Sequence, residues 1–373
     1  MAKSKKGHRY VSGFLMFCLV VMLLVLAALV GAFMSYSYVR NAKANVKGAL
    51  TNSADAKQII IPPEKSIYFE VPRGASTNTI AEKLEEAGLI KYPQIFKILS
   101  KVNGYDGLYK FGTHIVSKEL GYEELMMTLI KKPEIVKVTI PEGLTSLQVY
   151  DTLVKSGLTY ANEIRANIGK MEFDYDFLIN LPKRANPLEG YLFPDTYEFD
   201  LSAKPEDIVG VLLRNFANRI PEEYYERAEE LGMTMDQIII LASIIEREAK
   251  DEDDRFLVSG VFYNRLNSKD ESLKRLQSCA TIQYVFYLRN GIMLRRISEN
   301  DTKVADPYNT YTNQGLPPGP ICNPGLSSIK AALYPAETEY YYFVARGDGT
   351  HQFSKTYSEH QEAILEYGLN LLP

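Results

Sequence analysis

An uninterrupted apolar stretch near the N-terminus constrains this chain more than any other feature of its sequence. Residues 14–34 carry no charged side chain. At 1.5 Å per residue, a helix of that length extends about 31 Å, which is enough to cross the hydrocarbon layer of a bilayer. The sequence therefore predicts one transmembrane helix, assigned to residues 14–36, preceded by a cytoplasmic tail of residues 1–13.

The charges around this stretch indicate its orientation. Four basic residues lie within residues 1–9, which favours a cytoplasmic N-terminus, although three more follow within residues 40–47. A cleaved signal sequence is the alternative, with Ala42-Lys43-Ala44 as its cleavage site. Its apolar region should span only about 7–15 residues, so an uncleaved anchor is favoured. Both interpretations place the rest of the chain on the extracytoplasmic side.

Composition limits the function of that outer part. The formal net charge of −4 provides no basic surface for nucleic acid. Cys18, Cys279 and Cys322 form no CxxC pair or Cys/His cluster, so the sequence predicts no metal site. Because Cys18 lies in the apolar stretch, at most one disulfide could form outside, and none is assumed.

A polar linker and an internal repeat follow the apolar stretch. Residues 37–66 are small, polar and charged, and they predict a linker that ends in Pro62-Pro63. The segment VPRG at 71–74 is repeated as IPEG at 140–143, and similar residues continue at the same offset.

Each copy of the repeat predicts a short strand, a turn and a helix. Ser76 and Thr145 are the expected N-caps of the two helices. Gly88 and Gly157 stand where a glycine commonly ends a helix.

Longer helical patterns begin near Lys204, so that strands and helices are mixed along the chain and the predicted fold class is α+β. The expected helices cover residues 205–220, 221–231, 234–250 and 358–369, and a strand is expected at 340–345.

Glu246 lies near the end of the strongest predicted helix. At about 100° per residue, its carboxyl group emerges at the edge of an apolar stripe. Apolar surroundings disfavour the ionised form, and a protonated carboxyl group near neutral pH is what a general acid needs. The alternative is a structural glutamate neutralised by an arginine such as Arg255 or Arg265.

Segments rich in tyrosine and amide side chains surround this helix in the sequence. They read LEGYLFPDTY at 188–197, VFYNRL at 261–266, RLQSCAT at 275–281 and YNTYTNQGLPPGPICNPG at 308–325. Tyrosine rings suit the apolar faces of sugars, and amides can both donate to and accept from sugar hydroxyls. Taken singly, each of these residues is more often a packing residue or part of a turn.

Taken in order, these segments and YYFVARGDGTHQFS at 341–354 resemble the MltG/YceG-like endolytic murein transglycosylases over nearly the whole chain. The repeated unit resembles the LysM-like subdomains that bind cell-wall glycan, and a duplicated module without a ligand is the alternative. The implied organisation is a first LysM-like module at 67–135, a second with its connection at 136–203, and a catalytic domain at 204–373.

The resemblance implies an activity and a catalytic residue. Members of the family cut the β-1,4 bond between N-acetylmuramic acid and N-acetylglucosamine in nascent peptidoglycan and leave a 1,6-anhydro end, which would set strand length. The glutamate of the family's catalytic helix falls on Glu246. The chemistry requires neither metal nor cofactor. The implied partners are peptidoglycan strands, the membrane through residues 14–36, peptidoglycan synthases and the elongation or division machinery.

Residue type and the motif match together predict the side chains that hold the sugars. They are Glu189, Tyr197, Asn264, Gln277, Ser278, Thr281, Tyr308, Asn309, Tyr311 and Asn323.

One departure from the family pattern stands in the RLQ segment, where many relatives have Asp-Pro and this chain has Cys279-Ala280. We interpret it as a structural position.

Three alternatives remain open on the sequence alone. A hydrolytic muramidase would use Glu246 with a water molecule, and a second carboxyl group such as Glu189, Asp195 or Asp306 could reach it through the fold. A non-catalytic scaffold would bind glycan strands and recruit synthases. His351 and His360 are further acid–base candidates, for which packing or hydrogen bonding is favoured.

Overall fold

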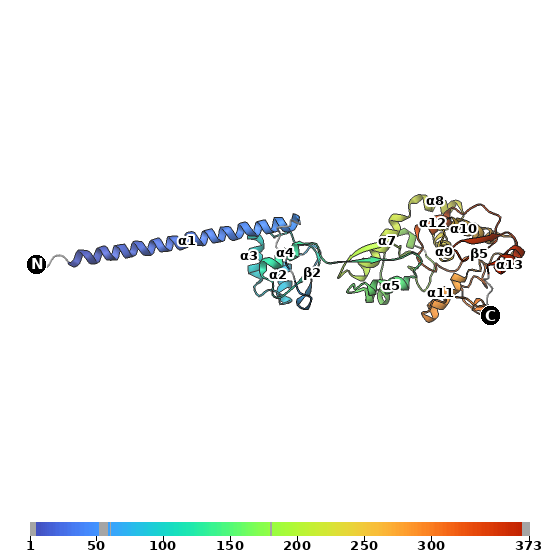
Figure 1. Cartoon of the computed structure of the whole chain (residues 1–373), viewed down its shortest axis with the longest axis horizontal. Coiled ribbons are helices and arrows are strands. Elements are labelled where there is room, and N and C mark those ends of the chain that lie inside the picture. The colour runs from blue at the N-terminus through green and yellow to red at the C-terminus, as the bar shows by residue number, and fades with distance from the viewer. Residues whose placement is uncertain (1–4, 52–58, 60, 180, 368–373) are drawn as a thin grey trace. The chain divides into compact units, whose positions relative to one another are not determined.

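The computed structural model describes residues 5–51, 59, 61–179 and 181–367, and it divides the chain into two compact units (Figure 1). Unit 1 comprises Met1–Ile135 with Asp200–Ser202, and unit 2 comprises Val136–Phe199 with Ala203–Pro373. The finer domain limits given above stay predictions. Strands and helices are mixed in the chain, which confirms the predicted class.

The first element is a 47-residue helix, α1 (Lys5–Thr51). Its part Leu15–Asn41, in which an 18-residue window reaches a mean hydropathy of 3.0, is long and apolar enough to cross a membrane, a property that anchors and signal sequences share. The helix continues beyond the expected end at residue 36 into the predicted linker. Residues 37–51 contain no proline and several alanines, so their polar composition is compatible with a continued helix.

The globular part of unit 1 is small and has its own core. Its elements are β1 (Ile67–Val71), α2 (Thr77–Glu86), α3 (Pro93–Asn103), β2 (Gly112–Val116) and α4 (Tyr122–Ile130). The two strands pair antiparallel, with Phe69 opposite His114. Buried apolar side chains from both strands and all three helices fill the space between them.

The structure confirms how the two copies of the repeat begin and end their helices. Ser76 accepts a hydrogen bond from the main-chain N–H of Thr79 at the start of α2. Thr145 does the same for the N–H of Gln148 at the start of α5 (Ser146–Lys155). Gly88 and Gly157 follow the two helix ends with positive φ angles of 66° and 89°. The likeness to LysM subdomains stays a prediction.

Unit 2 carries most of the helices. In chain order its elements are β3 (Ile135–Thr139), α5, α6 (Ile164–Asn167), β4 (Thr196–Asp200), α7 (Pro205–Arg219), α8 (Glu222–Glu230), α9 (Met235–Glu248), α10 (Glu252–Leu266), α11 (Cys279–Asn290), α12 (Leu326–Leu333), β5 (Tyr342–Ala345), β6 (His351–Ser354) and α13 (Tyr357–Glu366). Strand β3 pairs with β4, and β5 pairs antiparallel with β6. Helix α11 and strand β6 were not predicted, and residues 368 and 369 of the expected last helix lie outside the described residues.

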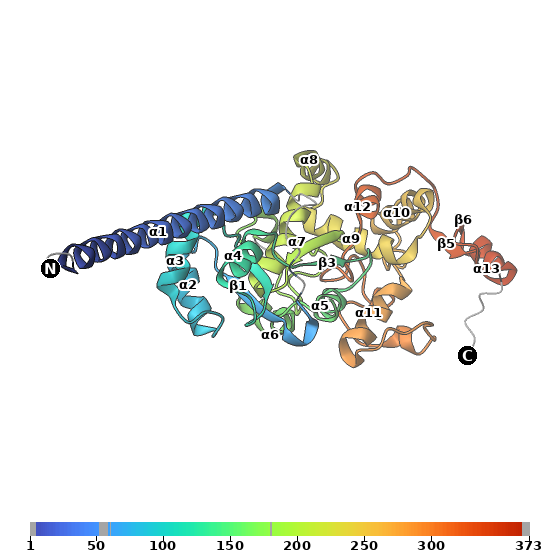
Figure 2. The same ribbon diagram turned by 60° about the vertical axis from the view of Figure 1, so that its left-hand side comes forward.

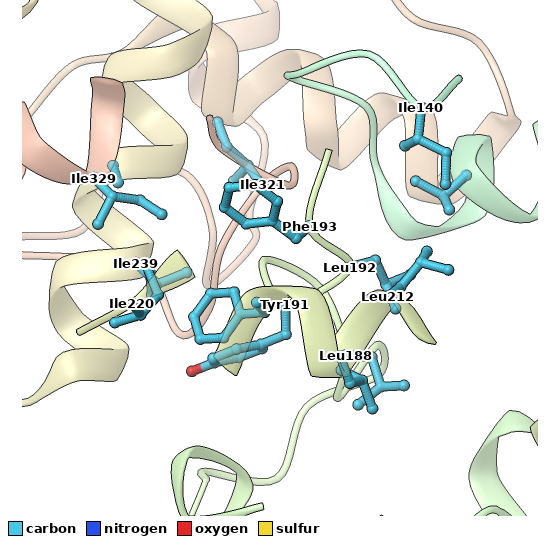
Figure 3. Packing of buried hydrophobic residues seen from close by; sticks show 14 of the residues in the cluster. Ile140, Leu188, Tyr191, Leu192, Phe193, Leu212, Ile220, Ile239, Ile321 and Ile329 are labelled. Carbon is cyan, nitrogen blue, oxygen red and sulfur yellow. The ribbon is translucent and has the colours of Figure 1, made fainter. Parts of the chain in front are cut away.

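Helix α9 is the centre of unit 2. It contacts α8, α10, α11 and α12, and both views show it beside α10 and α12 (Figures 1 and 2). Every residue from 238 to 245 is buried. Figure 3 shows Ile239 of this helix near Ile329 of α12, with Tyr191 and Phe193 of the LEGYLFPDTY segment in the same core. The position of Glu246, one residue beyond this buried run, is therefore fixed by packing on several sides.

Candidate active site

Glu246 lies in the last turn of α9. The helix begins with a reciprocal capping box between Thr234 and Gln237, and its apolar run draws it into the core. Glu246 follows that run, and its side chain is only 7% exposed. The sequence expectation of a carboxyl group at the edge of a buried stripe is confirmed.

The carboxylate of Glu246 is held by polar groups as well as by apolar walls. Its Oε2 accepts hydrogen bonds from the main-chain N–H of Gly325 at 3.1 Å and from the Ser328 hydroxyl at 2.7 Å. These donors belong to the first turn of α12. The guanidinium of Arg255 lies 3.8 Å from Oε1, which is an ion-pair distance but too long for a good hydrogen bond. The site thus combines features of the catalytic and the structural interpretation of Glu246.

The turn between β3 and α5, which contains the second copy of the repeat, forms another wall of this site. Gly143 has a positive φ of 76°, and a Cβ atom there would lie 3.6 Å from Cγ of Glu246. Arg247 approaches the carbonyl of Gly143 at 3.5 Å. The neighbouring Glu142 directs its carboxyl group toward Gly325. The sequence reasoning did not identify Glu142, although its place in the IPEG segment was visible.

Asn323 fastens this turn to the rest of unit 2. Its side chain is fully buried, and its Oδ1 accepts hydrogen bonds from the main chain of Gly190 at 3.0 Å and Leu192 at 2.9 Å. Its Nδ2 donates to the carbonyl of Leu144 at 2.9 Å, and its own carbonyl accepts from Gly143. One amide therefore joins the 188–197 segment, the IPEG turn and the entrance to α12.

Glu189 is also completely buried. Its carboxyl group accepts from the main-chain N–H of Ser146 at 2.7 Å, from the Ser146 hydroxyl at 3.0 Å and from Tyr284 at 3.1 Å. Burial raises the pKa of Glu189 to about 7, against the lowering effect of those donors. This side chain links α5 to α11.

Ser278 and Thr281 lie at the start of α11 and are buried. The Ser278 hydroxyl donates to Glu248, two residues beyond Glu246, and burial raises the pKa of that carboxyl group. Thr281 lies 3.0 Å from the hydroxyl of Thr310. Gln277, by contrast, is exposed, and it accepts from Arg265 at 2.5 Å.

The remaining predicted sugar ligands have protein partners as well. Tyr197 donates to the carbonyl of Phe193 at 2.5 Å, and Asn264 donates to the carbonyls of Thr338 and Tyr340. The buried Asn309 donates to Thr302 and Val304 and so shapes the 308–325 loop. Tyr308 and Tyr311 are partly exposed. The structure therefore gives most of these groups an internal bond, and their contact with sugar stays a prediction.

The two histidine candidates have different surroundings. His351 pairs through Nδ1 with Asp254 at 2.9 Å, and the same carboxylate accepts from the His351 main chain. His360 stacks on Tyr342, and burial lowers its pKa. These contacts agree with the favoured role in packing and hydrogen bonding.

Neither Cys279 nor Cys322 forms a disulfide. Cys279 lies 3.0 Å from the Tyr311 hydroxyl, and the buried Cys322 contacts the carbonyl of Ser243. Within the described part of the chain, no group of three His, Cys, Asp or Glu side chains is placed to hold a metal ion.

Comparisons with known proteins define the family. The model of the YceG-like family matches residues 69–366, which is most of the sequence. The chain belongs to the YceG-like family. A crystal structure of a YceG-like protein from Listeria monocytogenes is 31% identical, with a TM-score of 0.50, over 80% of this chain and 99% of that one.

Two curated relatives carry a functional name. A Bacillus subtilis protein named endolytic murein transglycosylase is 30% identical over 83% of this chain and 88% of its own length. A Streptococcus pneumoniae protein of the same name is also 30% identical, over 93% of this chain. This chain spans 65% of the streptococcal protein.

Proposed function

We propose that this chain is an endolytic lytic transglycosylase that cleaves peptidoglycan and is anchored in the cell membrane. Membership of the YceG-like family and the names of the Bacillus and Streptococcus relatives support this function. The structural observation that carries it is the enclosed carboxyl group of Glu246, with two hydrogen-bond donors on one of its oxygens.

The proposed reaction breaks the β-1,4 bond between N-acetylmuramic acid and N-acetylglucosamine. In its simplest form, Glu246 protonates the departing glycosidic oxygen. The resulting carboxylate then accepts the proton of the C6 hydroxyl as that oxygen attacks the anomeric carbon, which leaves a 1,6-anhydro end. Gly325 and Ser328 stabilise the negative charge that appears on Glu246 after it donates its proton.

The ten predicted sugar ligands remain part of this proposal. The members with exposed surface are Asn264, Gln277, Tyr308 and Tyr311, so they are the ones that could touch a glycan directly. Fully buried members such as Glu189 and Asn323 would contribute by holding the loops that form the site.

The apolar part of α1 completes the proposal. An uncleaved anchor with an extracytoplasmic ectodomain would keep the enzyme where new strands leave the membrane. Cleavage at that place would set the length of nascent strands, in company with peptidoglycan synthases.

Product analysis with purified glycan strands tests the function. The full chain in detergent should release fragments with 1,6-anhydro ends, each lighter by one water than the corresponding hydrolysis product. Glu246→Gln should lower the rate at least about 100-fold, because the amide cannot transfer a proton. Glu229→Gln, an exposed position on α8, serves as the matched control and should keep the wild-type rate.

Three outcomes would contradict the proposal. Fragments with reducing ends would identify a hydrolytic muramidase. Full cleavage by a folded Glu246→Gln variant would remove Glu246 from the chemistry, and absence of cleavage by the wild-type chain with retained glycan binding would favour the scaffold.

A further inference from the structure

A second carboxyl group borders the same glycine as Glu246. A Cβ atom built on Gly325 would lie 2.0 Å from Oε1 of Glu142 and 2.1 Å from its Cδ, so this carboxyl group rests directly against the glycine. The main-chain N–H of Gly325 donates to Oε2 of Glu246 at 3.1 Å. Glu142 and Glu246 therefore flank one residue at the start of α12.

The two carboxyl groups have different surroundings. Glu246 has two hydrogen-bond donors and the Arg255 guanidinium near it, an environment that suits a carboxylate. No hydrogen-bond donor to the Glu142 side chain is seen among the described residues. Although Glu142 as a residue is exposed, its carboxyl end lies against protein atoms at Gly325.

The charges facing Glu142 come from two helices. Glu246 belongs to α9 and Arg255 belongs to α10, and the first turn of α12 contributes no titratable group. Arg247 of α9 lies against the neighbouring Gly143. Burial and the nearby charge of Glu246 raise the pKa of Glu142, and Arg255 acts in the opposite direction. Two adjacent carboxyl groups in unlike surroundings are the usual arrangement for an acid and a base.

We propose that Glu142 is the proton donor to the glycosidic oxygen and that Glu246 is the base that accepts the C6 hydroxyl proton. This assignment rests on the proposed function, and it divides between two side chains the two proton transfers that Glu246 alone would otherwise perform. The IPEG turn is then part of the catalytic machinery as well as a wall of the site.

The proton balance closes without water or a co-reactant. Protonated Glu142 gives its proton to the oxygen that leaves the anomeric carbon, and the C1–O4 bond breaks. O6 of the same muramic acid forms the new C1–O6 bond and passes its proton to ionised Glu246. Transfer of a proton from Glu246 to Glu142, directly or through solvent, restores the starting state.

Substrates with different leaving groups can distinguish the role of Glu142 as acid from the role of Glu246 as base. A phenolate needs no proton to depart, so a synthetic aryl β-glycoside of a muramic-acid-terminated glycan does not require the acid. Glu142→Gln should lose at least about 100-fold in kcat/KM on natural strands, but less than about 10-fold on the aryl substrate. Glu246→Gln should be impaired on both substrates, because the base is needed in each case.

Gly325→Ala provides an independent test that leaves Glu142 in the sequence. Gly325 has φ −75° and ψ 167°, which alanine adopts freely, so the new methyl group should displace the flexible Glu142 carboxyl group rather than unfold the chain. Like Glu142→Gln, this variant should lose kcat/KM on natural strands and keep most of it on the aryl substrate. The double variant with Glu142→Gln should be no slower than Glu142→Gln alone.

The controls distinguish failure of this inference from failure of the proposed function. Glu198→Gln, on the exposed face of β4, should behave as wild type. If wild type forms 1,6-anhydro ends and Glu142→Gln retains its natural rate, or loses equally on both substrates, Glu142 is not the acid. Absence of anhydro products from the wild-type chain would instead overturn the proposed function.

Discussion

The buried carboxyl group of Glu189 couples the folding of unit 2 to pH. Burial raises the pKa of Glu189 to about 7 from the ordinary value of 4.5. Between those values the folded chain keeps the proton and the unfolded chain releases it. The unfolded state therefore binds fewer protons, and stability falls as pH rises through this interval.

Glu189→Gln should reduce this pH dependence. For wild type, the contribution of this one group to the free energy of unfolding should fall by about 3 kcal/mol between pH 4.5 and pH 7. Differential scanning calorimetry at several pH values should show a flatter dependence of Tm for the variant. The exposed Glu198→Gln should keep the wild-type slope, and equal slopes for wild type and Glu189→Gln would show that Glu189 does not carry the effect.

At the scale of elements, the N-terminal cap of α9 and its buried run together hold Glu246 in place. Thr234 and Gln237 exchange hydrogen bonds with each other's main chain at the start. The buried run of residues 238–245 fixes the helix in the core. Loss of the N-terminal cap should therefore lower the stability of unit 2 and leave the position of the Glu246 carboxyl group largely unchanged.

Thr234→Ala should lower the stability of unit 2 by about 1 kcal/mol, because the N–H of Gln237 loses its acceptor. For a unit of this size the corresponding fall in Tm is about 2–4 °C. Thermal unfolding checks the shift, and hydrogen exchange of peptides from α9 locates it. Thr234→Ser keeps the acceptor and should stay close to wild type; an equal loss in both variants would point away from capping.

Elements with strong local signals were predictable. The helices α7, α8 and α9 have apolar residues at helical spacing and recognisable ends, and the structure places them within two residues of the expected limits. Helix α11 begins at Cys279 in the RLQSCAT segment, for which sugar ligands and no helix were predicted. Strand β6 has four residues and depends on pairing with β5, a contact that local sequence does not encode.

At the scale of the whole molecule, the proposed anchor would determine where the enzyme acts. The stretch Leu15–Asn41 is apolar enough for either an anchor or a signal sequence. Membranes from cells producing the full chain should retain the protein after an alkaline wash and release it only with detergent. Mass analysis of the intact protein should find residues 1–44 present, whereas a chain that begins after Ala44 would show cleavage.

The sequence by itself determined the apolar helix, the mixed class, the caps of the repeated helices and the place of Glu246 at the end of a buried run. These depend on periodicity and on neighbours within a few positions, which the order of residues states directly. The family resemblance, carried by motifs in their order, likewise needed no coordinates.

Only the tertiary structure decided what surrounds Glu246. Glu142 lies 104 positions before it in the chain and Gly325 lies 79 positions after it, and no local pattern connects the three. The tertiary structure also decided the role of Asn323. Its amide side chain suggested a sugar ligand, but it is buried and forms hydrogen bonds to two separate loops. A residue type fixes which bonds a side chain can form, and packing decides which of them it forms.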